Sequence, residues 1–214
     1  MAKVEPFERF TQRYDSWFEK HRFVYFSELE AIKSVLPGGT GLEVGVGTGR
    51  FASPLGIQYG VEPSINMAKI AYQRGINVVL GVAENLPFKD KTFDFVLFTT
   101  TICFVDDLKR SFEEACRVLK KDGCLIAGFI DRNSKAGQFY MENKNKSPFY
   151  ADAVFYSTEE VLDYLRKTCF SSFKIVQTVF GLPYEIDSVQ PVKEGYGEGS
   201  FVVIKAIKQK GNGQ

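Results

Sequence analysis

The sequence predicts an α/β fold: a doubly wound, mostly parallel seven-stranded sheet with an antiparallel last strand and an N-terminal helical cap. Two observations predict it. Short apolar runs of strand length alternate with amphipathic helical segments between residues 41 and 130, as in a parallel sheet covered on both faces. The last two apolar runs have no room for a crossover helix between them. We expect a single domain over residues 1–214, with the helical cap at 1–36 and an insertion at 133–156.

The cap is predicted from aromatic spacing. Phe7, Phe10, Tyr14, Trp17 and Phe18 recur every three or four residues, which is the spacing of one helical face. We expect helices over residues 6–20 and about 25–35. The Pro-Gly-Gly segment at 37–39 ends the second helix.

The alternating region supplies five strands and two complete helices. The strands are expected at 41–46, 57–61, 77–82, 93–98 and 124–130, and the helices at 63–74 and 108–120. Ser64 or the proline before it begins the first of these helices, and Gly75 ends it. The strands should therefore lie in one parallel sheet.

The C-terminal part has a different pattern. The run Ser157-Thr158-Glu159-Glu160 is a capping box that begins a helix reaching about residue 169. Strands are expected at 173–180 and 200–208, and the segment between them is rich in glycine and proline, which favours an antiparallel pair. Residues 210–214 are expected to be disordered.

Composition excludes several function classes. The net charge is +1 and no long basic run is present, which argues against a nucleic-acid-binding protein. His21 is the only histidine, so a metal site built from several imidazoles is excluded and no metal is expected. No apolar run reaches the roughly 18 residues that a membrane helix needs.

The cysteine pattern indicates a reducing compartment. None of the four, Cys103, Cys116, Cys124 and Cys169, forms a C-x-x-C pair, and each lies among apolar residues. We interpret all four as buried, reduced thiols. The charged N-terminus has no signal-peptide pattern, so a cytoplasmic location is expected.

The most specific motif is a glycine loop, Glu43-Val44-Gly45-Val46-Gly47-Thr48-Gly49-Arg50, at the end of a predicted strand. Glycines let the backbone turn tightly and approach a ligand. Dinucleotide-binding enzymes favour G-x-G-x-x-G, which would need a glycine at position 50. The spacing here is G-x-G-x-G, with an acid two residues before the first glycine.

This loop resembles that of the class I (Rossmann-like) S-adenosylmethionine-dependent methyltransferases, in particular the small-molecule, ubiquinone-biosynthesis-like branch. Three further segments resemble the same family in the same order: residues 60–67 (GVEPSINM), 81–88 (GVAENLPF) and 117–125 (RVLKKDGCL). The resemblance covers about residues 10–132 and the final strand pair.

The resemblance implies S-adenosyl-L-methionine as cofactor. It implies that Glu62 accepts hydrogen bonds from the ribose hydroxyls, and that Ser64 and Met67 lie by the adenosine. The full predicted set of cofactor-binding residues is Glu43, Gly45, Gly47, Gly49, Glu62, Ser64, Met67, Ala83, Glu84 and Thr99. Val82 departs from the family, which often has an aspartate for the adenine there, so Glu84 or a backbone carbonyl is the expected substitute. Residues 50–61 are too few for the usual first helix, which should be a stub.

Methyl transfer from a sulfonium needs positioning and exclusion of water more than an acid or a base. The residues that bind or orient the acceptor are expected among Tyr14, Trp17, Phe18, Phe104, Asp131 and Tyr140, beneath the 133–156 insertion. The aromatic walls make a small amine plausible among N, O or C nucleophiles, and His21 is a weaker candidate for a base.

We therefore expect a methyltransferase of a small-molecule acceptor, with no nucleic-acid or membrane partner, as a monomer or homodimer. Three alternatives stay open from the sequence: an NAD(P)-dependent oxidoreductase, a non-catalytic S-adenosylmethionine-binding protein, and an RNA or protein methyltransferase, against which the near-neutral charge argues.

Overall fold

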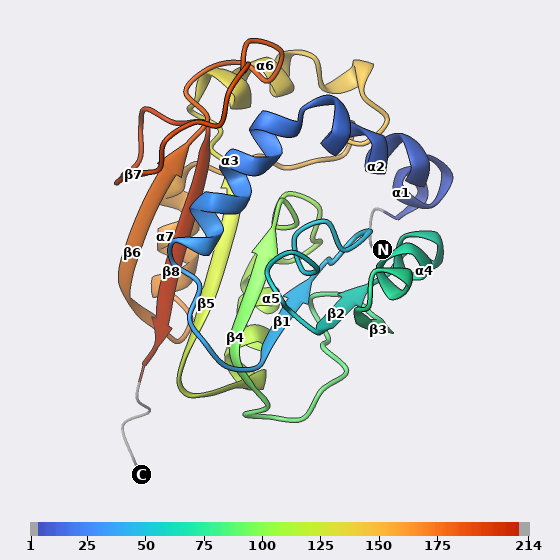
Figure 1. Ribbon diagram of the computed structural model, residues 1–214. Helices are drawn as coiled ribbons and strands as arrows, with labels where there is room; N and C mark the ends of the chain where they lie inside the picture. The colour runs from blue at the N-terminus through green and yellow to red at the C-terminus, as the bar shows by residue number, and fades with distance from the viewer. Residues whose placement is uncertain (1–3, 210–214) are drawn as a thin grey trace.

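A computed structural model describes residues 4–209, and the predicted disorder of residues 210–214 lies outside them. One mixed sheet has the strand order β3-β2-β1-β4-β5-β8-β6-β7 (Figure 1). Its strands are β1 Gly41–Val44, β2 Tyr59–Glu62, β3 Asn77–Leu80, β4 Phe93–Thr99, β5 Leu119–Ile130, β6 Phe170–Thr178, β7 Lys193–Glu194 and β8 Phe201–Lys208.

Strand directions confirm the predicted fold class. Strands β1 to β5 pair in parallel, and β8 is antiparallel to both β5 and β6, so β6 runs in the direction of the first five strands. The antiparallel last strand is therefore inserted between β5 and β6. The sequence missed only β7, a two-residue strand at the edge beside β6.

The core consists of two layers, one on each face of the sheet. Along β4, Val96 and Phe98 point into one layer, while Phe95 and Leu97 point into the other. This follows from the alternation of side chains along a strand, and it explains why the central strands are apolar at successive positions.

Helices cover both faces of the sheet. The N-terminal helices are α1 Glu5–Arg9, α2 Thr11–Lys20 and α3 Arg22–Lys33, and the others are α4 Ile65–Gln73, α5 Leu108–Val118, α6 Lys135–Glu142 and α7 Thr158–Arg166. In Figure 1, α3 crosses in front of β5 and β8, whereas α5 and α7 lie behind the sheet. Helices α1 and α2 extend from α3 toward α4, so they form the predicted cap.

Local signals predicted most of these helices. The helix expected over residues 6–20 is instead divided at Phe10 into α1 and α2, and α6, within the expected insertion, was not predicted. The capping box at Ser157 is present, with the Ser157 side chain accepting from the Glu160 amide and the Glu160 carboxylate accepting from the Ser157 amide. Residues 50–56 form turns with two isolated i→i−4 hydrogen bonds, from the Ser53 amide to Gly49 and from the Leu55 amide to Phe51, so the expected stub is not a regular helix. After α6, a short 3₁₀ helix spans Lys144–Lys146.

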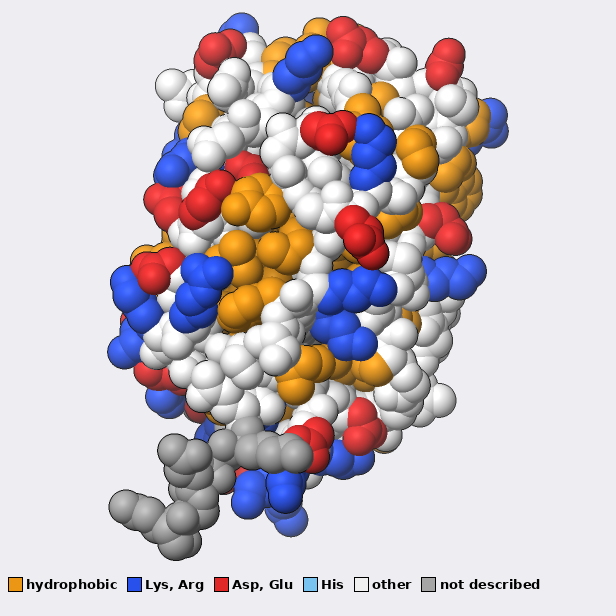
Figure 2. All heavy atoms as spheres, turned by 90° about the vertical axis from the view of Figure 1, so that its left-hand side faces the viewer, with side chains coloured by type: hydrophobic (Ala, Val, Ile, Leu, Met, Phe, Trp, Pro, Cys, Tyr) orange, Lys and Arg blue, Asp and Glu red, His pale blue; other side chains and the backbone are white. Residues whose placement is uncertain are grey.

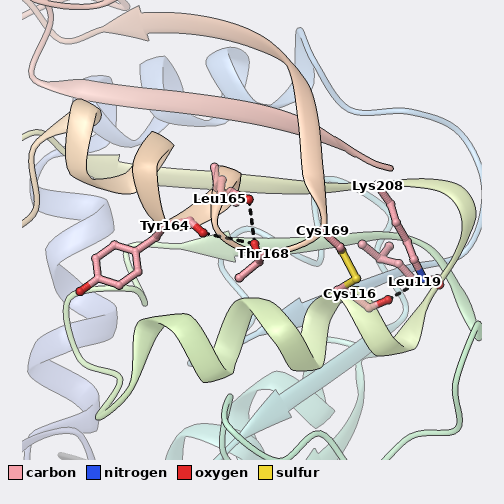
Figure 3. Close-up of a disulfide and its surroundings, with 7 residues drawn as sticks. All are labelled: Cys116, Leu119, Tyr164, Leu165, Thr168, Cys169 and Lys208. Atoms are coloured by element: carbon pink, nitrogen blue, oxygen red, sulfur yellow. Dashed lines mark hydrogen bonds between the residues drawn. A yellow bond between two sulfur atoms is a disulfide. The ribbon is translucent and has the colours of Figure 1, made fainter. Parts of the chain in front are cut away.

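The expectation of four reduced thiols is wrong for two of them. Cys116, in the last turn of α5, forms a disulfide with Cys169, directly before β6 (Figure 3). Their Cα atoms are 6.3 Å apart although 53 positions separate them in the chain. Cysteine spacing alone could not reveal this pairing, because only the sheet order brings the end of α5 beside the start of β6.

A lysine reinforces the same corner. Lys208, at the end of β8, donates from Nζ to the carbonyls of Cys116 and Leu119, at 2.7 Å each (Figure 3). A positive charge at the C-terminus of α5 satisfies carbonyls that have no intrahelical partner and complements the helix dipole. The end of α5 is therefore joined to the start of β6 by the disulfide and to the end of β8 by the Lys208 hydrogen bonds.

The surface agrees with the near-neutral composition. On the face seen from the left of Figure 1, lysine and arginine are interspersed with aspartate and glutamate around a small apolar area (Figure 2). Within residues 4–209, no helix is long and apolar enough to cross a membrane.

Candidate active site

A cavity of about 830 Å³ lies at the carboxyl ends of the parallel strands, beneath the cap. Ligands of open α/β sheets bind at this edge, and the volume is within the range of small-molecule sites. Its floor comes from the ends of β1, β2, β4 and β5, and its roof comes from α1, α2, α3 and α6.

The three glycines of the loop after β1 differ in their surroundings. All have positive φ: 69° at Gly45, 55° at Gly47 and 80° at Gly49. A Cβ at Gly45 would lie 2.4 Å from the Thr101 side chain, and a Cβ at Gly49 would lie 3.3 Å from the α4 backbone. Gly45 and Gly47 line the cavity, whereas Gly49 permits close packing of the loop on α4. Only Gly47 presents a bare backbone mainly to the cavity.

Glu62, the last residue of β2, organises this loop. Its carboxylate accepts from the amide of Gly47 at 2.8 Å and from the amide of Ser64 at 2.9 Å. The side chain is buried and lines the cavity. Burial raises the pKa of Glu62 to about 7, although the two amide hydrogen bonds oppose the shift. An acid at the strand tip is therefore held by backbone donors on both sides.

The segment after β3 forms one end of the cavity. Val82, Ala83 and Glu84 line it, together with Met67 from α4. A Glu84 carboxylate oxygen accepts from the amides of Asp106 and Asp107, which ties this segment to the start of α5. The Glu84 carboxylate is therefore held by the start of α5 and does not point freely into the cavity.

Ser64 caps helix α4 and also connects it to helix α1. Its hydroxyl caps α4 by accepting from the Met67 amide, and it donates to Glu8 of α1. Glu8 also accepts from the amide of Asn66. Ser64 does not line the cavity but joins the cap to the helix beside it.

Asp15 of α2 makes a second connection between the cap and the body of the protein, through the glycine loop and the end of α4. Its carboxylate accepts from both Arg50 and Arg74 and from the Thr48 hydroxyl, with distances of 2.6 to 2.9 Å. Burial opposes ionisation, but these hydrogen bonds together lower the pKa of Asp15 well below its usual range. No sequence pattern indicated this residue, because its partners are 33 to 59 positions away.

Two buried polar atoms beneath the cavity have no hydrogen-bond partner among the described residues: Glu43 Oε2 and Thr99 Oγ1. Thr99 reaches the cavity wall, whereas Glu43 lies behind it. The next residue, Thr100, has φ of 51°, which is costly for a β-branched side chain and is typical of functional sites. Thr100 and Thr101 both line the cavity.

The roof is aromatic, as the sequence predicted. Five of the six acceptor-pocket candidates line the cavity: Tyr14, Trp17, Phe18, Phe104 and Tyr140. His21 also lines it and lies against Trp17, with ring centroids 4.9 Å apart. Burial and the nearby Lys20 charge lower the pKa of His21, while a hydrogen bond to the Pro183 carbonyl opposes this shift.

Asp131 is the sixth candidate, and it does not line the cavity. Its carboxylate accepts from the Asn133 amide at 2.7 Å and from the amide and hydroxyl of Thr158. It therefore anchors the start of α7 to the end of β5. This geometry gives it a structural role rather than the substrate contact that we expected.

Replacing Asp131 with alanine should lower the free energy of unfolding by about 1–3 kcal/mol, because buried donors lose their acceptor. Thermal denaturation would show a decrease of several degrees in Tm. Asp152→Ala, which removes an exposed carboxylate, is the matched control and should leave Tm within about a degree. Equal Tm values for the two variants would contradict the anchoring role.

Burial raises the pKa of three carboxyl groups near the cavity. The pKa is raised to about 8 for Glu28 and for Glu43, and to about 7 for Glu62. Glu28, on α3, was not singled out by the sequence, yet it is only 5% exposed and lines the cavity.

These shifts predict that the ligand-free protein loses stability as the pH rises. Between about pH 4.5 and 8, the unfolded chain releases these protons while the folded chain retains them. Folded protein then binds more protons, and the free energy of unfolding falls with pH. Urea denaturation at pH 5.5, 7 and 8.5 would measure the slope, and Glu28→Gln should make it shallower. A free energy of unfolding that is constant or rises over this range would contradict the prediction.

The residues at this site fit an S-adenosylmethionine molecule. Above Gly47, the position of a missing Cβ meets only the Tyr14 side chain, at 3.3 Å, so a bare cradle faces the cavity. A buried carboxylate suited to two hydroxyl donors, Glu62, stands beside it. An unpartnered hydroxyl, that of Thr99, lies on the same wall. Together, the fold and site define an S-adenosylmethionine-binding enzyme of the Rossmann-like class.

Comparison with known proteins supports the same class of enzyme. A family model described as "Methyltransferase domain" matches residues 42–127. A SAM-dependent methyltransferase of Thermotoga maritima, named a possible histamine N-methyltransferase, has a crystal structure 57% identical to this chain. It matches with a TM-score of 0.94, over 96% of this chain and 99% of that one.

Two further relatives extend the comparison. The uncharacterised protein MJ1123 of Methanocaldococcus jannaschii is 50% identical over 96% of this chain and 100% of its own length. A demethylmenaquinone methyltransferase of Staphylococcus epidermidis is 28% identical, over 84% of this chain and 81% of its own. The chain belongs to the S-adenosylmethionine-dependent methyltransferases, and S-adenosyl-L-methionine is its cofactor.

Proposed function

We propose that this enzyme transfers the methyl group of S-adenosylmethionine to a small-molecule acceptor, an N, O or C nucleophile, by in-line displacement. The observation that carries the proposal is one partly enclosed cavity of about 830 Å³, which extends from the cofactor-side residues Glu62 and Ala83 to the aromatic roof. Such an enclosure suits a small acceptor better than a folded protein or a nucleic acid. The name of the Thermotoga maritima relative, a possible histamine N-methyltransferase, is compatible with an amine among these acceptors.

The chain's own residues would act mainly by position. When bound, the cofactor supplies a methyl group on an already activated sulfonium. The glycine loop would hold its polar part, Glu62 its ribose, and Met67 and Ala83 its adenine. Val82 brings no acceptor, so packing and backbone carbonyls would hold the adenine edge. Tyr14, Trp17, Phe18, Phe104 and Tyr140 would enclose the acceptor and exclude water, which keeps the reacting atoms in near-attack contact.

The proposal is tested by incubating the protein with S-adenosylmethionine and a panel of amines, phenols and quinone-like acceptors, and by measuring S-adenosylhomocysteine. We expect acceptor-dependent formation of S-adenosylhomocysteine with at least one member. Tight cofactor binding with no product from any acceptor class would favour a non-catalytic cofactor-binding protein. Saturable binding of a reduced nicotinamide cofactor, without binding of S-adenosylmethionine, would favour an oxidoreductase.

Replacing Glu62 with glutamine should weaken S-adenosylmethionine binding by about 10- to 100-fold. The loss corresponds to one charge-assisted hydrogen bond of roughly 1.5–3 kcal/mol. The glutamine amide would also point a donor at the Gly47 or Ser64 amide, which are donors themselves. Isothermal titration calorimetry would measure the change, with Glu159→Gln, on the exposed start of α7, as control. Equal affinities of the two variants would contradict the role of Glu62.

The cytoplasmic location and the monomeric or homodimeric state belong to the same proposal. The disulfide is compatible with an intracellular protein, since intracellular proteins of hyperthermophiles can retain disulfides. Cell fractionation and light scattering would test the location and the oligomeric state.

A further inference from the structure

Glu28 is a buried carboxylate for which the fold provides no partner. It lies in the middle of α3, is 5% exposed and lines the cavity. Among residues 4–209, no hydrogen bond or ion pair reaches its carboxylate, and burial alone raises its pKa. Arg13, Lys20 and His21 line the same cavity, yet none of them pairs with it. Such a group is costly to ionise, so the ligand-free protein keeps it protonated near neutral pH. A cationic ligand would stabilise its charged form, which points to a ligand that pairs with it.

Glu28 lies in the half of the cavity away from the cofactor-binding residues. Helix α3 packs on β5, β6 and β8, whereas Gly47, Glu62 and Ala83 follow β1, β2 and β3 at the other side of the sheet. Ile130, Val179 and Phe201 line the cavity from the α3 side. A group bound to Glu28 therefore occupies the space left for the acceptor.

The walls around Glu28 are aromatic. Burial raises the pKa of Tyr140, and Glu28 is the one charged group that raises it further, which places the Tyr140 hydroxyl near Glu28. The rings of Tyr140 and Tyr150 are 4.9 Å apart, and both line the cavity. Aromatic faces with one negative charge attract a cation through the ring quadrupole and repel an anion. A neutral acceptor would leave the carboxylate unpaired.

Resting on the proposed function, we propose that Glu28 binds the protonated nitrogen of the acceptor, and hence that the acceptor is a primary or secondary amine with an apolar body. The carboxylate pairs with the ammonium, and the surrounding rings contact the rest of the molecule. Glu28 thereby selects amines over alcohols, phenols and carboxylates of the same shape.

The same pairing meets the proton requirement of the reaction. An ammonium has no lone pair, so its nitrogen must lose one proton before it can take a methyl group. Glu28 accepts that proton, and the N–H electron pair remains on nitrogen as the lone pair. That pair forms the new N–C bond, while the electrons of the C–S bond leave with sulfur in S-adenosylhomocysteine. Burial favours the protonated form of Glu28, which suits it to accept this proton.

The test measures binding of matched probes to protein saturated with S-adenosylhomocysteine, by calorimetry. The probes are phenethylamine, 2-phenylethanol and 3-phenylpropanoate, with benzylamine and benzyl alcohol as a shorter pair. We expect at least one amine to bind at least 10-fold more tightly than its alcohol, and the carboxylate not to bind. Glu28→Gln should abolish the preference for the amine. Glu30→Gln removes an exposed carboxylate from the same helix and should preserve it.

Each outcome separates this inference from the proposed function. S-adenosylhomocysteine should bind Glu28→Gln and the wild type with equal affinity, which also shows that the variant is folded. Equal binding of amines and alcohols to the wild type, or a preference for amines that survives Glu28→Gln, would overturn the inference while leaving methyl transfer intact. Failure of the wild type to bind S-adenosylhomocysteine at all would instead refute the proposed function.

Discussion

A valine at position 47 should abolish measurable S-adenosylmethionine binding, with a loss of more than about 100-fold in affinity, or roughly 2.7 kcal/mol. The missing Cβ of Gly47 points at the bare cradle beneath the Tyr14 hydroxyl, so two added methyl groups would occupy the space of the ligand. The same change has a cost in stability that sequence alone did not indicate. With φ of 55°, a β-branched residue is strained by roughly 1–3 kcal/mol.

A matched control separates the two effects. Gly75 also has positive φ, 85°, but it is exposed, with no heavy atom within 4 Å of a built Cβ. Gly75→Val should lose a similar amount of stability, because it has the same backbone strain, and should bind S-adenosylmethionine normally. Calorimetric titration and thermal denaturation of both variants would test this. If Gly47→Val retained normal affinity, the glycine loop would not be the cofactor cradle.

Removal of the Cys116–Cys169 disulfide should produce the largest stability change. Closing a loop of 53 positions removes chain entropy from the unfolded state worth about 4 kcal/mol in the loop-closure model. For a chain of this length, that loss corresponds to a decrease in Tm of roughly 8–16 °C. The double variant Cys116→Ala/Cys169→Ala should show it in a thermal scan.

Reductant provides the control for this experiment. Dithiothreitol should lower the Tm of the wild type toward that of the double variant and leave the double variant unchanged. A wild-type Tm that does not respond to reductant, in protein whose thiols are all titratable, would show that the disulfide does not form. Because both cysteines lie on the side of the sheet away from the cap, cofactor affinity should not change.

The sequence was most informative where the signal is local. The strands from β1 to β5, the cap helices and the capping box at Ser157 all follow from side-chain periodicity or from hydrogen bonds between residues three apart. The same holds for the glycine loop and Glu62, which lie within one strand-loop-strand unit. The antiparallel placement of β8 also followed, from the shortness of the segment before it.

What the sequence could not show depends on contacts between distant segments. Glu28 belongs to no motif. In the sequence it resembles any acidic residue on an amphipathic helix, and only the fold shows that it is buried at the cavity wall. Asp15 is found only when Arg50 and Arg74 converge on it. Asp131 is the reverse case: its place at a strand end indicated a ligand contact, but the Thr158 hydroxyl and amide take up its carboxylate. The disulfide belongs to the same class, because sheet order decides which cysteines meet.

The attachment of the cap by Asp15 and Glu8 has a consequence for how the enzyme cycles. Both carboxylates hold the roof to the segments that we propose to bind the cofactor, the glycine loop and the start of α4. Movement of the cap away from these segments, as in exchange of a bound ligand, would break these contacts. Because dissolved salt screens the ion pairs of Asp15 with Arg50 and Arg74, we expect rising ionic strength to loosen the attachment of the cap.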